Sequence, residues 1–226
     1  MEQPKINLTV STVGIFIAAF AIVLSVAYPE TEQLTVRASK AVNYFKPAKV
    51  VEPEVVDLSG EITPAKLELI LKSVAAQANI VGDEWSAFMA QCAHETMGFL
   101  SLVEFGTIAY FRKYDPRHSP SMAQTLGNTK PGDGARYRGR GYIQLTGRYN
   151  YRIAGQALNL PLEAHPELAA VPHIAAHIAV WYWNHRVRPN VQDFTNVRAV
   201  TRPINPKLRG LRDRKAKFKE YQLAQL

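Results

Sequence analysis

The sequence has very little cysteine, since Cys92 is the only one among 226 residues. No intrachain disulfide can form, so the fold must be held together by the packing of its core. Hydrophobic residues make up 47% of the chain and charged residues 20%. This balance excludes a wholly disordered protein. Cys92 itself lies in an apolar run, which predicts a small buried thiol.

Acidic residues are outnumbered in the larger part of the chain. Residues 61–226 carry 22 Lys and Arg against 13 Asp and Glu, a net charge of +9, whereas residues 1–60 carry five against six, or −1. The basic excess is strongest between residues 186 and 219. Such a field favours a polyanionic partner, namely nucleic acid, an anionic membrane or an anionic cell wall. Charge alone is equally compatible with a solvated basic surface.

Charged residues are absent from residues 6–28, a run of 23 positions. This run is long enough to cross a bilayer as a helix, so we predict a transmembrane or signal-anchor segment at residues 1–28. A cleaved secretory signal is one alternative, with residues 25–27 as a cleavage site. A buried core helix is the other.

The rest of the chain divides into a linker and one domain. Residues 29–60 contain three prolines, mixed charges and no sustained periodicity, which predicts a tether. From residue 61 to residue 226 helical spacing of apolar residues predominates, with Thr63-Pro64 typical of a helix start. Strand signals are short, and GYIQL at residues 141–145 is the best of them. We therefore expect a mainly α domain with a minor β element.

Metal and cofactor sites are not indicated. His94-Glu95 resembles the start of a zinc-protease helix, but such a helix needs a second histidine at position 98, which is Gly98. His173 and His177 have a spacing that can chelate a metal, but no third ligand is evident near them in the sequence. We expect two half-buried helix histidines, no metal and no cofactor.

Two carboxylates, Glu95 and Glu104, stand nine residues apart with Gly98 between them. A continuous helix would separate them by about 13 Å and turn them to opposite faces. A glycine favours the end of the helix and a reversal of the chain. The two acids can then flank one cleft at about 6.5–9.5 Å, which leaves room for a water that attacks a sugar from the far side. The pattern predicts a glycosidase site.

Four motifs occur in a characteristic order: AHETMGF at residues 93–99, RYRGRGYIQLTGRYNY at 136–151, VTRPIN at 200–205, and GLRDR after it. With these motifs, residues 83–221 resemble glycoside hydrolase family 19, especially its phage endolysin branch. The resemblance implies a two-lobed, lysozyme-like helical fold. It also implies cleavage of β-1,4 bonds in polymers of N-acetylated amino sugars, with inversion.

The resemblance also implies roles for single residues. Glu95 matches the general acid and Glu104 the general base. The matching substrate-binding positions are Gln144, Thr146, Asn150 and Asn205. A general acid must hold its proton near neutral pH, which an apolar setting formed by Phe99 and nearby aromatic residues would favour.

These observations predict a membrane-tethered, endolysin-like muramidase that cuts peptidoglycan between N-acetylmuramic acid and N-acetylglucosamine. Its partners would be peptidoglycan glycan strands and, through residues 6–28, the lipid bilayer, but not nucleic acid. The catalytic domain would face the cell wall from a bacterial inner membrane or a virion membrane. The alternatives are a chitinase and a non-catalytic, glycan-binding or structural membrane protein of a virion.

Overall fold

The computed structural model describes residues 61–225, which are mainly helical. The α-helices in chain order are α3 (Pro64–Gln77), α4 (Gly82–Glu95), α5 (Ile108–Phe111), α6 (Pro120–Leu126), α7 (Asp133–Arg136), α8 (Arg148–Leu158), α9 (Pro172–Tyr182), α10 (Val197–Ile204) and α11 (Leu211–Leu223). The shorter helical segments are η2 (Arg112–Tyr114), η3 (Pro166–Ala170), η4 (Trp183–Val187) and η5 (Arg188–Asn190).

The predicted anchor at residues 1–28 and the predicted linker at residues 29–60 lie outside the described residues. Between residues 61 and 225, no helix combines the length and the apolar character needed to cross a bilayer. The bilayer partner and the location of the protein therefore stay predictions.

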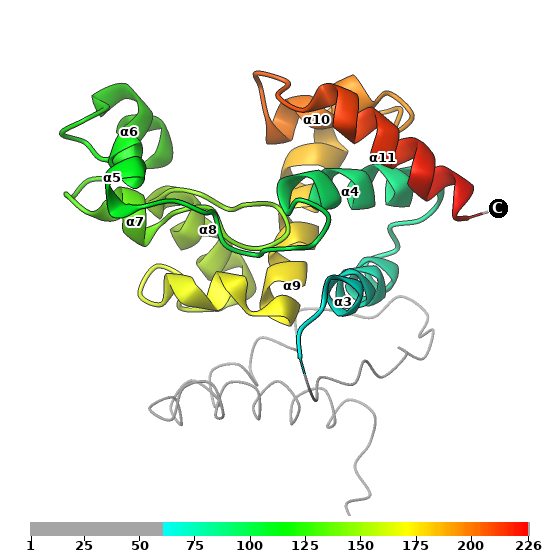
Figure 1. Cartoon of the computed structure of the whole chain (residues 1–226), viewed down its shortest axis with the longest axis horizontal. Coiled ribbons are helices and arrows are strands. Elements are labelled where there is room, and N and C mark those ends of the chain that lie inside the picture. Colours follow the sequence, from blue (N-terminus) through cyan, green and yellow to red (C-terminus); the bar gives the residue numbers. More distant parts are fainter. Residues whose placement is uncertain (1–60, 226) are drawn as a thin grey trace, which may run out of the picture. The chain divides into compact units, whose positions relative to one another are not determined.

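The helices gather in two groups (Figure 1). Helices α5, α6, α7 and α8 form one group, and α4, α10 and α11 lie together in the other. Helix α9 contacts both α3 and α8. One apolar stretch of α9 is fully buried, comprising Ile174, Ala175, Ala176, Ile178 and Ala179. Because so many of these side chains are small, neighbouring helices can pack closely around α9.

The start of the domain follows the sequence pattern. Pro64 is the first residue of α3, and the Thr63 side chain accepts a hydrogen bond from the Lys66 amide at 3.3 Å. A capping side chain of this kind satisfies one of the free amides of the first helical turn. The predicted helix start at Thr63-Pro64 is therefore confirmed.

The predicted β element is wrong, because the described part of the chain contains no strand. Arg140 forms only isolated bridges, to Val103 and to Leu145. Two residues of the GYIQL segment have left-handed backbone conformations, Gly141 with φ 75° and Gln144 with φ 49°. Left-handed residues turn the chain and stop a ladder from extending. The segment is therefore a tight loop.

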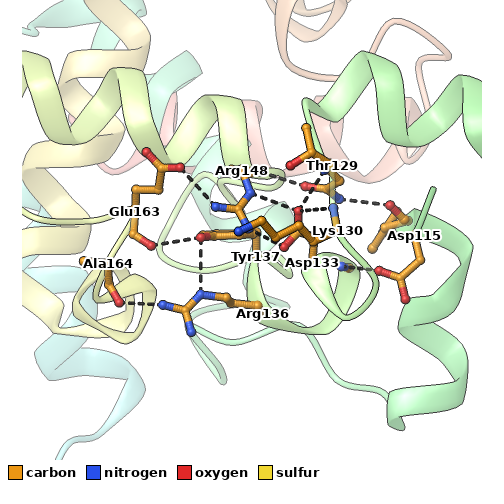
Figure 2. A network of polar contacts seen from close by, with 12 residues as sticks. Asp115, Thr129, Lys130, Asp133, Arg136, Tyr137, Arg148, Glu163 and Ala164 are labelled. Carbon is orange, nitrogen blue, oxygen red and sulfur yellow. Dashed lines mark hydrogen bonds and ion pairs between the residues drawn. The ribbon is translucent and has the colours of Figure 1, made fainter.

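A partly buried polar network holds residues 127–136, a glycine-containing stretch that precedes this segment (Figure 2). The Asp133 carboxylate accepts hydrogen bonds from the backbone amides of Thr129 and Lys130 at 2.8 and 3.0 Å. The Arg148 guanidinium donates to the same carboxylate at 2.6 and 2.9 Å and reaches Glu163 at 3.1 Å. The network ties the loop to the first residue of α8, and so fixes both ends of residues 137–147.

We expect Asp133→Asn to lower the free energy of unfolding by about 3 kcal/mol at pH 7, because it removes the buried one of the two carboxylates that pair with Arg148 and leaves only the more exposed Glu163. Asp133 is 2% exposed. Burial opposes the charge of Asp133, but its hydrogen bonds outweigh burial and lower its pKa below 3.8. A carboxylate with a lowered folded-state pKa stabilises above pH 3.8 and loses this contribution as the pH falls through the folded-state value.

Urea unfolding of both proteins between pH 7 and pH 2.5 checks this prediction. The difference between wild type and variant should shrink below pH 4. Glu220→Gln, at an exposed position of α11, is the control and should leave the pH dependence unchanged. A constant difference at all pH values would contradict the assigned role of the Asp133 charge.

Candidate active site

The end of helix α4 places the first carboxylate. Glu95 is the last residue of α4, and the next turn contains three consecutive left-handed residues, Met97, Gly98 and Phe99. The Thr96 hydroxyl stabilises the turn, since it accepts from the Phe99 amide at 3.0 Å and donates to the Cys92 carbonyl at 2.7 Å. The predicted chain reversal at Gly98 is confirmed, so no single helix carries Glu95 and Glu104.

Glu95 forms an ion pair with Arg214 of helix α11, whose side chain is 1% exposed. Arg214 Nη2 donates to Glu95 Oε1 at 2.5 Å, and Nη1 donates to Gln91 Oε1 at 2.6 Å. Arg214 Nε donates to the Arg209 carbonyl at 3.2 Å. Within residues 61–225 the second oxygen, Glu95 Oε2, has no hydrogen-bond partner. The expected apolar setting of Glu95 is therefore wrong, since a fixed guanidinium touches one of its oxygens.

The residue before Glu95 strengthens the same contact between helices. His94 Nδ1 lies 2.6 Å from Asp213 Oδ2, and the His94 ring lies against Gly210. A Cβ on Gly210 would stand 2.0 Å from His94 Cε1. The motif GLRDR thus supplies Gly210, which makes room for the His94 ring. It also supplies the side chains of Asp213 and Arg214, which hold the end of α4. The sequence predicted no role for this motif, although its glycine and charged residues were the available signal.

Glu104 is held by hydrogen-bond donors on both of its carboxylate oxygens. The Tyr114 hydroxyl donates to Oε1 at 3.0 Å, with Lys113 Nζ at 3.5 Å, and the Gly139 amide donates to Oε2 at 3.0 Å. Burial and, second, the Glu104 charge raise the pKa of Tyr114 to about 12, so this phenol keeps its proton and acts as donor. Donors of this kind stabilise a negative carboxylate.

Gly139 brings Glu104 and Gln144 together. The Glu104 amide donates to the Gly139 carbonyl at 2.8 Å, so the two residues are joined twice. A Cβ on Gly139 would stand 2.6 Å from Gln144 Oε1 and 3.2 Å from Glu104 Oε2. The absence of a side chain therefore lets both polar groups approach the same point. Gln144 itself is fixed by a bond from its Nε2 to the Gly141 carbonyl at 3.0 Å.

The other predicted binding residues fall into two places. The Thr146 hydroxyl donates to the Gln144 carbonyl at 2.8 Å, and Asn150 Nδ2 donates to the Thr146 carbonyl at 2.7 Å. These residues continue the Glu104 side of the site. Asn205 follows α10, and its Oδ1 accepts from the Arg209 amide at 3.5 Å. Because the Arg209 carbonyl also accepts from Arg214, Asn205 belongs to the Glu95 side.

The two sides meet along the segments that follow α4 and precede α8. The Gly141 amide donates to the Leu102 carbonyl at 2.8 Å, and Val103 forms a bridge to Arg140. Figure 1 shows these two segments running side by side between the two groups of helices. The separation of about 6.5–9.5 Å between the carboxylates stays a prediction.

The structure gives Cys92, His173 and His177 the buried or half-buried positions that the sequence predicted. Cys92 is buried, and burial raises the pKa of its thiol. A protonated, enclosed thiol is a poor nucleophile. His173 and His177 are both half-buried on α9, and burial, followed by the charge of His173, lowers the pKa of His177 to about 4. Residues 61–225 contain no cluster of three or more side chains suited to hold a metal.

We expect Arg214→Met to lower the free energy of unfolding by about 3 kcal/mol, because it leaves the half-buried Glu95 carboxylate and the buried Gln91 side chain without their partner. Denaturant unfolding measures the change. Arg212→Met, at an exposed position of the same helix, should stay within about 0.5 kcal/mol of wild type. Equal stabilities of the two variants would contradict the role assigned to Arg214.

Comparisons with known proteins agree with this geometry. Residues 71–200 match the glycoside hydrolase family 19 domain, described as chitinase class I. A glycosyl hydrolase family 19 domain-containing protein of Haemophilus influenzae is 32% identical over 68% of this chain and 88% of its own length. An endochitinase of Arabidopsis thaliana is 36% identical over 58% of the chain, but the match spans only 42% of that relative.

A solved structure shares the fold. Chitinase C from Streptomyces griseus is 27% identical, with a TM-score of 0.52 over 70% of this chain and 68% of its own. The matched region includes the helix that ends at Glu95 and the loop that holds Glu104 and Gln144. The chain therefore belongs to glycoside hydrolase family 19 and is a glycoside hydrolase with a mainly helical, lysozyme-like fold.

Proposed function

We propose that this glycoside hydrolase cuts the β-1,4 bond between N-acetylmuramic acid and N-acetylglucosamine in peptidoglycan, with inversion. Glu95 acts as the general acid and Glu104 as the general base. One observation carries the assignment of acid and base: the two carboxylates differ in how many of their oxygens are bound. Glu104 accepts hydrogen bonds on both of its carboxylate oxygens. Glu95 accepts a hydrogen bond from Arg214 on one oxygen, and its other oxygen has no partner within residues 61–225.

The contact with Arg214 occupies only one oxygen of Glu95, so the other oxygen can carry a proton. The guanidinium itself favours the charged carboxylate and therefore does not hold that proton in place. A protonated Glu95 can keep its hydrogen bond from Arg214 on Oε1 and carry the proton on Oε2. The proton passes to the glycosidic oxygen as the bond from that oxygen to the sugar carbon breaks. The carboxylate left behind gains a negative charge beside the guanidinium, which stabilises the charge where it develops.

The contacts of Glu104 suit a base. Its carboxylate is fixed by the Tyr114 hydroxyl and the Gly139 amide, which leaves further lone pairs for a water. That water attacks the sugar carbon from the face opposite to the leaving oxygen and gives a proton to Glu104. Inversion follows, because the bond forms on one face of the ring and breaks on the other.

Two observations support peptidoglycan as the polymer. The domain from residue 61 to residue 226 has a net charge of +9, which attracts it to an anionic wall. The sequence motifs also resemble the phage endolysin branch of the family. Chitin is the second candidate, because similar proteins of Arabidopsis thaliana and Streptomyces griseus are named endochitinase and chitinase.

Digestion of purified sacculi and of chitin by the full chain separates the two substrates. We expect soluble muropeptides with N-acetylmuramic acid at the reducing end, identified by mass spectrometry, and the inverted anomer in the first NMR spectra. Products of sacculi with N-acetylglucosamine at the reducing end would refute the assigned bond and place the cut at the other glycosidic bond of the strand. Activity on chitin alone would overturn the assignment to peptidoglycan.

We expect Glu95→Gln to abolish clearing of sacculi, because an amide cannot donate the required proton, while binding to sacculi is retained. Turbidity measures clearing and co-sedimentation measures binding. Glu220→Gln is the matched control, since it makes the same change at an exposed position and should clear at the wild-type rate. Clearing by the Glu95 variant would refute its role as the acid.

Gly139→Ala should lower kcat at least tenfold with little change in thermal stability. The added Cβ displaces the flexible ends of Gln144 and Glu104, and small misplacements of catalytic groups have large effects on rate. Steady-state kinetics and a melting curve check this outcome. A normal kcat would show that the approach of these side chains to Gly139 does not matter for catalysis.

A further inference from the structure

A solvent-open hollow of about 580 Å³ lies beside helix α10 and is lined mainly by polar residues. Arg186 comes from η4, and Arg198 and Arg202 come from α10. Asn190 and Asn196 complete its polar lining. We call this surface the arginine hollow. All five of these residues are exposed and therefore accessible to a ligand from solvent.

The three guanidinium groups lie together, and in the part of the chain that the structure describes no neighbouring acidic side chain neutralises their positive charge. None of them forms an ion pair with another described residue between 61 and 225. Arg198 and Arg202 stand four residues apart on one helix, a spacing at which like charges repel. The neighbouring Asp193 carboxylate accepts from the Thr195 hydroxyl and amide. An incoming anion would relieve this repulsion.

The two asparagines offer complementary groups for a peptide. Asn196 Oδ1 accepts from the Ala199 amide at 3.1 Å, which leaves its NH₂ group to donate. Asn190 Nδ2 donates to the Arg186 carbonyl at 2.9 Å, which leaves its oxygen to accept. One donor and one acceptor beside three cations match a peptide that carries carboxylates.

Tyr182 connects the arginine hollow with the Glu95 side of the active site. Its hydroxyl donates to the carbonyl of Pro203, a lining residue, at 2.9 Å. Burial raises the pKa of Tyr182, Arg186 lowers it, and the Glu95 charge raises it. Tyr182 therefore lies within electrostatic range of Arg186 and of Glu95. Helix α10, which supplies two of the arginines, also leads directly to Asn205.

We propose that the arginine hollow binds the carboxylates of the peptide stems on the glycan strand that Glu95 and Glu104 cut. This inference rests on the proposed function, and it names the chemical groups by which the enzyme would tell peptidoglycan from chitin. Chitin carries no carboxylates, whereas each muramic acid of peptidoglycan bears a lactyl group that is extended by an acidic peptide. The hollow therefore favours the peptide-bearing polymer without touching the bond that is cleaved.

The test compares the full-length triple variant Arg186→Gln, Arg198→Gln, Arg202→Gln with wild type. The matched control is Arg212→Gln, Lys215→Gln, Lys219→Gln, which removes the same charge from exposed positions of α11. Three ligands are used: sacculi freed of wall phosphate polymers, chitin particles, and the glycan strands that an amidase releases from the sacculi, bound to beads so that they sediment. Co-sedimentation measures binding, and initial rates give KM and kcat.

We expect the triple variant to bind intact sacculi about tenfold more weakly, equal to about 1.4 kcal/mol, with a matching rise in KM and an unchanged kcat. The loss should be much smaller on the bead-bound glycan strands, which keep only their lactyl carboxylates, and absent on chitin. The α11 control should change less than twofold.

Equal losses on all three ligands, or an equal loss in the control, would overturn the proposal in favour of a general charge effect. Unchanged binding would overturn it directly. Binding separates this outcome from a failure of the proposed function. A wild type that cuts only chitin would refute peptidoglycan hydrolysis. Binding of peptide carboxylates by the arginine hollow would still be supported if the triple variant selectively lost binding to intact sacculi.

Discussion

The ion pair between Glu95 and Arg214 is the contact on which the arrangement of this site depends. A buried guanidinium is costly unless every part of it is satisfied, and Arg214 is bonded to Glu95, to Gln91 and to the Arg209 carbonyl. These bonds hold the end of α4 against the start of α11. The orientation of the first carboxylate is therefore set by a helix that lies more than a hundred residues further along the chain.

The second carboxylate depends on a different constraint, the close approach of two loop segments. Glu104 and Gly139 are joined by two hydrogen bonds because Gly139 has no side chain to separate them. The loop before Gly139 is itself held by Asp133 and Arg148 (Figure 2). Each acid thus has its own support. A substitution in one support can change one acid without moving the other, which makes the two roles separable by experiment.

The features that could be predicted from the sequence are those that depend on contacts between residues close together in the chain. Thr63 and Pro64 begin a helix, and Gly98 reverses the chain, because caps and left-handed residues act over a few positions. Alternation in GYIQL predicted a strand, but Gly141 and Gln144 adopt conformations that only the surrounding contacts select. Arg214 was missed as the partner of Glu95 for the same reason, since pairing across 119 residues leaves no periodic signal. The roles of the six predicted site residues came from resemblance, and the geometry adds their contacts.

Substrate choice cannot come from the two acids alone. Chitin and peptidoglycan share the β-1,4 bond between N-acetylated sugars, so an acid and a base placed for one polymer are placed for the other. Discrimination requires groups that meet the substituents of the strand rather than its backbone. Three exposed arginines beside α10 are suited to this, because opposite charge can raise the affinity for an acidic strand while leaving the chemical step unchanged. Family membership accounts for the reaction, and the proposed binding of acidic substituents by Arg186, Arg198 and Arg202 would account for a choice between polymers.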